Sequence, residues 1–144
     1  MSDITFDGKT HMLTLTNRAG VVVNAWPANN KTTRNARPRF IPDGVYYFYN
    51  TKFPTRHPAG GDELQGEFGT YGIVLLKKPS SEEAWGIGIH SGRQAYRGKS
   101  DGAGAYHRTQ GCIRTTDSAM GTITTIMRGD PLVQLFVNNN HLQD

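Results

Sequence analysis

Short apolar or alternating stretches recur along the chain and are separated by turn residues, a pattern that predicts β-strands. Residues 11–16 alternate most clearly between apolar and polar side chains. Pro42-Asp43-Gly44 has the composition of a turn, because proline presets φ and glycine accepts a positive φ. The stretches expected to form strands are 11–16, 21–26, 45–49, 71–77, 84–90 and 132–137.

One stretch has a helical period instead. Met120, Ile123 and Met127 share one face of a helix that Thr116 or Asp117 would cap and Gly129 would end. We therefore expect a mainly β fold, a small sandwich or barrel with one short helix.

The composition agrees with one small β domain. Of the 144 residues, 36% are hydrophobic and 19% are charged, which excludes a membrane protein and a disordered chain. The 17 glycines and 7 prolines favour a turn-rich β fold over a helical bundle. We expect a single domain over residues 1–144, with 138–144 as a frayed polar tail.

The net charge and the N-terminal sequence limit which partners and which cellular location we expect. The net charge of +4 suits an acidic partner, but the basic residues are scattered, which argues against nucleic acid. The N-terminal segment lacks the basic and apolar regions of a signal peptide, and no apolar run approaches the ~20 residues that cross a bilayer. These features predict a protein made in the cytoplasm, without a signal peptide and without a membrane span.

Cys112 is the only cysteine of the chain, so it cannot form an internal disulfide. Such a residue is either a small buried apolar group or a candidate nucleophile. The neighbouring Arg114 and the start of the predicted helix would both lower the thiol pKa. Gly111 allows a tight turn, so the backbone N–H groups of Gly111 and Cys112 are a candidate oxyanion hole.

His90 ends the predicted strand 84–90 and is the candidate base. Gly86, Gly88 and His90 alternate onto the same face of this strand, opposite its large apolar residues. The two glycines leave that face open to another backbone or a ligand. A histidine that is merely hydrogen-bonded at a strand end is the alternative interpretation.

The segments His90-Ser91 and Thr109-Gln110-Gly111-Cys112-Ile113-Arg114 together resemble the signature of the L,D-transpeptidase (YkuD-type) catalytic domain. The order, histidine before cysteine, also matches, whereas papain-like and NlpC/P60-type peptidases have the cysteine first. An early hairpin, a Pro-Asp-Gly-Val-Tyr segment and a closing Gly-Asp-Pro-Leu-Val strand extend the similarity.

This resemblance implies the L,D-transpeptidase fold and a cysteine acyl-transfer reaction without a cofactor. Cys112 would attack the carbonyl between an L-configured centre and a D-residue in a peptidoglycan stem tetrapeptide. His90 would act as base, and the Ser91 carbonyl would orient its ring. The resemblance also implies that Arg114 holds a stem carboxylate and that Thr109 and Gln110 contact the substrate. The acyl group would pass to an amine, giving cross-linking or D-amino-acid exchange, or to water, giving L,D-carboxypeptidase activity.

Two features depart from the family pattern. Gln110 stands where the family usually has a histidine. The interval between His90 and Thr109 holds 18 residues (91 to 108), slightly more than is usual, and contains His107 as a rival base. We prefer His90 because it follows a strand and precedes Ser91.

The lack of a signal peptide makes the chain similar to L,D-transpeptidase effectors delivered by type VI secretion. The segments Phe6-Asp7-Gly8-Lys9 and Gly111-Cys112-Ile113-Arg114 carry this similarity. It implies a toxin acting in the periplasm of a target bacterium, with secretion machinery and an immunity protein as partners. A housekeeping enzyme trimmed of its signal peptide would look the same.

Two other functions remain open at this stage. His57, His90, His107 and Cys112 are possible zinc ligands, but their spacing matches no known zinc pattern, so we expect no metal site. The second possibility is a cell-wall-binding module that has the same fold but no catalytic activity. Gln110, which replaces the family's usual histidine, is the reason to consider it.

Overall fold

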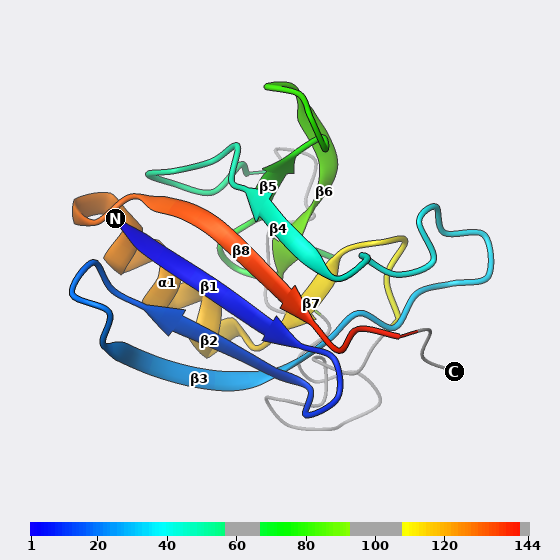
Figure 1. Ribbon diagram of the computed structural model, residues 1–144, viewed down its shortest axis with the longest axis horizontal. Helices are drawn as coiled ribbons and strands as arrows, with labels where there is room; N and C mark the ends of the chain where they lie inside the picture. Colours follow the sequence, from blue (N-terminus) through cyan, green and yellow to red (C-terminus); the bar gives the residue numbers. More distant parts are fainter. Residues whose placement is uncertain (57–66, 93–107, 142–144) are drawn as a thin grey trace.

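A computed structural model describes residues 1–56, 67–92 and 108–141 of the chain. Eight strands and one helix lie in these residues (Figure 1). The strands are β1 (Ser2–Asp7), β2 (Met12–Thr16), β3 (Val22–Asn29), β4 (Gly44–Tyr47), β5 (Val74–Lys77), β6 (Ala84–His90), β7 (Ile113–Thr115) and β8 (Leu132–Asn138). The helix is α1 (Asp117–Gly129). The prediction of a mainly β fold with one short helix after the cysteine is confirmed.

The strands form one strongly curved sheet in the order β4-β8-β1-β2-β3-β7-β6-β5. Strands β1 and β8 pair in parallel, as do β6 and β7, and the other neighbours are antiparallel. The two edges approach each other, because Phe48, just after β4, forms a bridge with Leu76 of β5. The sheet is therefore a nearly closed barrel.

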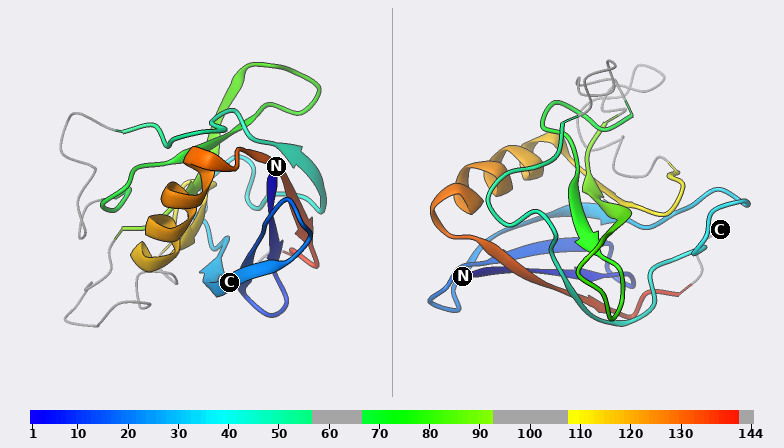
Figure 2. Two further views of the ribbon diagram at one scale, coloured as in Figure 1. Left: turned by 90° about the vertical axis from the view of Figure 1, so that its left-hand side faces the viewer. Right: turned by 90° about the horizontal axis from the view of Figure 1, so that it is seen from above.

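The helix α1 lies between the β1–β3 part of the sheet and its β5–β6 part (Figure 2). The apolar residues predicted to share one helix face, Met120, Ile123 and Met127, are all fully buried in the core. Thr116 caps the helix, since its hydroxyl accepts a 3.0 Å hydrogen bond from the Ala119 N–H. At 13 residues, the helix in the described part of the chain is too short to span a membrane.

Two strands were not predicted, and the tail differs from expectation. β1 alternates buried Ser2, Ile4 and Phe6 with partly exposed residues, whereas β7 has only three residues. The chain beyond β8 is anchored rather than frayed as far as Asn140. This residue is 2% exposed, and its N–H donates to the Asp43 carboxylate at 2.8 Å.

Candidate active site

The ends of β6 and β7 bring the candidate residues together. These strands are parallel, with Ile89 opposite Ile113 and His90 opposite Arg114. Opposed residues in such a ladder project to the same face, and side chains two positions apart share a face. His90, Arg114 and Cys112, which is two residues before Arg114, therefore belong to one face at one end of the sheet.

Cys112 and His90 line the same cavity, which has a volume of about 580 Å³. Its other lining residues are Thr55, Glu67, Phe68, Ile73, Leu75, Gly86 and Gln110. Gly86 has φ +81° and open space where a Cβ would stand, so it leaves this wall without side-chain bulk, as the sequence predicted. Three of the predicted site residues, Cys112, His90 and Gln110, thus face one space large enough for a peptide segment.

The imidazole of His90 is held in a fixed orientation. Its Nδ1 lies 2.7 Å from the Ser91 carbonyl oxygen, and the ring is 1% exposed. Phe68 packs edge-on against the ring, with centroids 5.1 Å apart. A carbonyl oxygen only accepts hydrogen bonds, so Nδ1 is the donor, and in the neutral imidazole the lone pair is then on Nε2. This is the tautomer that a general base requires.

The hydroxyl of Ser91 ties this part of the site to the helix. It donates to the Asp117 carboxylate at 2.8 Å, and the same oxygen accepts the Thr70 N–H at 3.0 Å. A Cβ at Gly69 would lie 1.9 Å from the Ser91 hydroxyl, so only glycine allows the chain to pass here. Asp117 was predicted only as a helix cap. Its hydrogen bond with Ser91, which connects the start of the helix to the site, was not apparent from the sequence.

Arg114 is fully buried and acts inside the protein. Its Nε donates to the Ser91 carbonyl at 3.2 Å, the same oxygen that holds His90. Its Nη2 contacts both the backbone oxygen and the carboxylate of Glu67, at 2.8 and 3.0 Å, and Nη1 donates to the Arg108 carbonyl at 3.2 Å. The expected contact with a substrate carboxylate would have to displace Glu67, whereas the contact with Ser91 lets Arg114 hold the carbonyl that orients the His90 ring.

The turn before Cys112 is fixed by a residue that sequence reasoning missed. Asn30 is buried, and its side-chain amide donates to the carbonyl oxygens of Gly111 and Cys112, at 2.9 and 3.0 Å. In a trans peptide the C=O and the following N–H point in opposite directions. The Cys112 N–H therefore points away from Asn30, which leaves it as a candidate oxyanion donor.

Thr109 and Gly111 have contacts within the same turn. The Thr109 hydroxyl donates to the Cys112 carbonyl at 2.6 Å and accepts the Gly111 N–H at 3.2 Å. Thr109 is 2% exposed and is not among the lining residues of the cavity, although it was predicted to contact the substrate. Its hydrogen bonds stabilise the turn instead. The Gly111 N–H, expected in the oxyanion hole, is used inside the turn.

The expected lowering of the Cys112 pKa is wrong. Burial raises the thiol pKa to about 11, and the Glu67 carboxylate also raises it. A hydrogen bond from the Gly88 N–H and the charge of Arg114 lower it, but less than burial raises it. The helix dipole contributes little, because the three residues of β7 and the cap separate Cys112 from the helix, and the dipole effect falls off within a turn. The Cys112 thiol is thus protonated near neutral pH.

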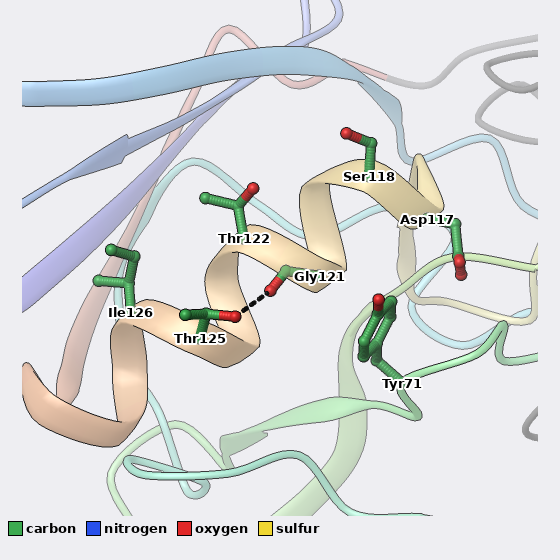
Figure 3. A pocket seen from close by; sticks show the side chains of 7 residues that line it. All are labelled: Tyr71, Asp117, Ser118, Gly121, Thr122, Thr125 and Ile126. Atoms are coloured by element: carbon green, nitrogen blue, oxygen red, sulfur yellow. Dashed lines mark hydrogen bonds between the residues drawn. The ribbon is translucent and has the colours of Figure 1, made fainter.

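A second hollow, of about 480 Å³, lies along the polar side of α1 (Figure 3). Tyr71 points toward the helix there, and a Cβ at Gly121 would come within 3.0 Å of the tyrosine hydroxyl. The lining carries hydroxyl groups and the carboxylate of Asp117 but neither thiol nor imidazole. The cavity with Cys112 is therefore the candidate catalytic one.

Some predictions fall on residues that the structure does not describe. His57, His107 and most of the interval 91–108 lie outside the described residues. Within the described ranges, no group of three or more His, Cys, Asp or Glu side chains is placed to hold a metal ion.

Comparisons with solved structures agree with this architecture, whereas the sequence comparisons find no match. No protein-family model matches the sequence, and no curated protein matches it. Among solved structures, Bd1075 of Bdellovibrio bacteriovorus is similar at a TM-score of 0.61 and 12% identity, over 99% of this chain and 49% of that one. An L,D-transpeptidase from Xylanimonas cellulosilytica has a TM-score of 0.59 and 16% identity, over 94% of this chain and 59% of that one.

The catalytic domain of the E. faecium L,D-transpeptidase matches at a TM-score of 0.50 and 20% identity, over 94% of this chain and 97% of that domain. This chain thus spans about half to three fifths of the first two structures but nearly the whole of the isolated catalytic domain. At these identities the similarity establishes the fold, which is that of L,D-transpeptidase catalytic domains.

Proposed function

We propose that this protein is a cysteine acyl-transfer enzyme that acts on peptidoglycan stem tetrapeptides. The observation that carries the proposal is that Cys112 and His90 line one cavity, with the His90 ring oriented by the hydrogen bond between its Nδ1 and the Ser91 carbonyl. The fold and the motif around Cys112 support the same reaction class. The presence of this geometry also favours an enzyme over a binding module, which would not need an oriented base.

The raised thiol pKa defines the first chemical step. The thiol is protonated near neutral pH, so attack requires transfer of its proton to His90 Nε2 as sulfur bonds to the scissile carbonyl carbon. The Cys112 N–H would stabilise the resulting oxyanion. Collapse of the tetrahedral intermediate breaks the C–N bond, and His90 returns the proton to the departing D-alanine amine. An amine or water then attacks the thioester and regenerates the thiol.

Disaccharide-tetrapeptide muropeptides with an added D-amino acid test this proposal. Purified protein should release or exchange the terminal D-alanine, as read by mass spectrometry, and Cys112→Ala should not. The mass of the product also identifies the acceptor as amine or water. Muropeptides left unchanged by the wild-type protein would favour the non-catalytic binding module instead.

We further propose that the enzyme is a secreted antibacterial effector whose site of action is the periplasm of a target bacterium. The similarity of Phe6-Asp7-Gly8-Lys9 and Gly111-Cys112-Ile113-Arg114 to the type VI effector subgroup supports this. Expression with an added export signal should arrest growth, while expression without it, or of exported Cys112→Ala, should not. Normal growth with the active exported protein would favour a housekeeping role.

A further inference from the structure

A further hollow lies where the barrel is not closed, between β4 and the hairpin formed by β5 and β6. β4 pairs with β8 on one side, and the chain just after it meets β5 at the bridge between Phe48 and Leu76. The hairpin projects from the barrel beside β4 (Figure 1). The hollow has a volume of about 710 Å³, and its described lining residues are Val45, Tyr46, Tyr47, Lys77, Lys78, Pro79, Ser80, Ser81 and Glu82.

The wall formed by β4 offers aromatic and apolar surface to a ligand. Tyr47 and Val45 line the hollow and are each 51% exposed. The ring of Tyr46 is fixed, because it stacks on Trp85 with centroids 5.9 Å apart and its hydroxyl donates to the Pro42 carbonyl at 2.6 Å. A ligand that covers Tyr47 therefore buries apolar ring surface against a wall that is already ordered.

The wall formed by the hairpin carries charges that cancel in pairs. Lys77 forms an ion pair with Glu82, and Lys78 forms one with Glu83. Two serines that line the hollow add hydroxyl groups. This wall offers hydrogen-bond donors and acceptors but little net charge. It therefore favours a neutral ligand rich in hydrogen-bonding groups over an anion or a cation.

Strand β5 connects the hollow with the catalytic cavity. Ile73 and Leu75 line the cavity of Cys112, whereas Lys77 lines the hollow. Side chains two positions apart in a strand share a face, and the residues between these three are buried in the core. The cavity and the hollow are therefore neighbouring parts of one face, the face of β5 opposite to the core.

The same strand fixes the distance between them. Val74 pairs with Ile89, so Ile73 is level with His90. Lys77 is four residues beyond Ile73, which is about 13 Å along the strand. In a stem tetrapeptide that loses its last residue, three residues precede the scissile bond, and they span about 10 Å when extended. A peptide that runs along β5 from His90 thus brings the group before its first residue to the hollow.

We infer that this hollow is a subsite for the disaccharide to which the stem peptide is attached. An N-acetylated disaccharide is neutral and carries hydroxyl and amide groups, which suit the wall formed by the hairpin. Each sugar ring also has an apolar C–H face, which packs on the ring of Tyr47. The inference rests on the proposed function, since it takes the muropeptide as the ligand.

Binding measured with and without the saccharide tests this subsite. In the Cys112→Ala background, calorimetry should show that the disaccharide-tetrapeptide binds about 10-fold more tightly than the free tetrapeptide. Tyr47→Ala should abolish this difference by weakening binding of the disaccharide-tetrapeptide alone, whereas Tyr47→Phe, which keeps the ring, should retain it. The matched control is Tyr49→Ala, because Tyr49 is 49% exposed but is not among the described lining residues of the hollow.

Equal affinity of the two ligands for the parent, no binding of either, or a difference that survives Tyr47→Ala would overturn the subsite. An equal loss for the free tetrapeptide in Tyr47→Ala would also overturn it and assign the hollow to the peptide.

Muropeptide turnover, measured alongside with Cys112 intact, separates failure of the subsite from failure of the function. Turnover with a KM that Tyr47→Ala leaves unchanged would overturn the subsite and leave the enzyme assignment standing. Tyr47-dependent binding of the disaccharide-tetrapeptide without any turnover would support the subsite and refute the proposed reaction.

Discussion

Replacing Asn30 by alanine removes the buried amide that fixes the turn carrying Cys112. Its Nδ2 donates to the Gly111 and Cys112 carbonyls, and its Oδ1 accepts the Ile41 N–H at 2.6 Å and the Asn140 side-chain amide at 3.0 Å. A buried hydrogen bond contributes about 1 kcal/mol net, and Asn140 keeps a second bond to the Ile41 carbonyl. We therefore expect a loss of about 3–4 kcal/mol, a large part of the 5–15 kcal/mol typical of a domain.

Denaturant unfolding measures this loss, and muropeptide turnover below the melting temperature measures its effect on the site. The melting temperature should fall by about 10 °C. Turnover should fall beyond what the folded fraction explains, because the Cys112 carbonyl loses its anchor. Asn35→Ala, at an exposed position, is the control, and Asn30→Asp keeps the volume but replaces the donor with an acceptor. If Asn30→Ala unfolded within 1 kcal/mol of wild type and kept its turnover, the turn would not depend on this amide.

The remaining predictions concern the base, the thiol and the ion pair beside them. His90→Ala should lower kcat about 10²- to 10⁴-fold with the fold intact by circular dichroism; a small change would indicate another base. Because the folded thiol pKa of about 11 exceeds its reference value of 9.0, folding favours the neutral thiol, and this stabilisation is complete below pH 9 and lost by pH 11. Wild type should thus lose about 2 kcal/mol more than Cys112→Ala between pH 8.5 and 11 in denaturant titrations, and parallel curves would disprove it. Glu67→Gln removes a charge that raises this pKa, so iodoacetamide should alkylate Cys112 at lower pH than in wild type, whereas exposed Glu82→Gln should leave the profile unchanged. Arg114→Lys should destabilise the fold by about 3 kcal/mol and lower kcat more than it raises KM, since one ammonium cannot replace the contacts of the buried guanidinium; a pure KM effect would return Arg114 to substrate binding.

The parts of this fold that could be predicted are those that depend on sequence patterns within a few residues. The helix after Cys112 follows from the spacing of Met120, Ile123 and Met127 and from its cap, all within a few residues. Asn30 could not be predicted in the same way, because its partners are 81 and 82 residues away in sequence. Strand β7 has three residues, too few for a period. The Cys112 pKa depends mainly on burial of the thiol. The sequence showed the neighbouring charge and helix but not this burial.

The position of β8 has a consequence for how the chain reaches its active form. This last strand lies inside the sheet between β4 and β1, and its partner β1 begins at residue 2. Neither β1 nor β4 has its full set of backbone partners until residues 132–138 are available. Contacts so distant in sequence form slowly and late. The chain therefore completes its barrel, and with it the cavity of Cys112, only after synthesis has passed the last strand.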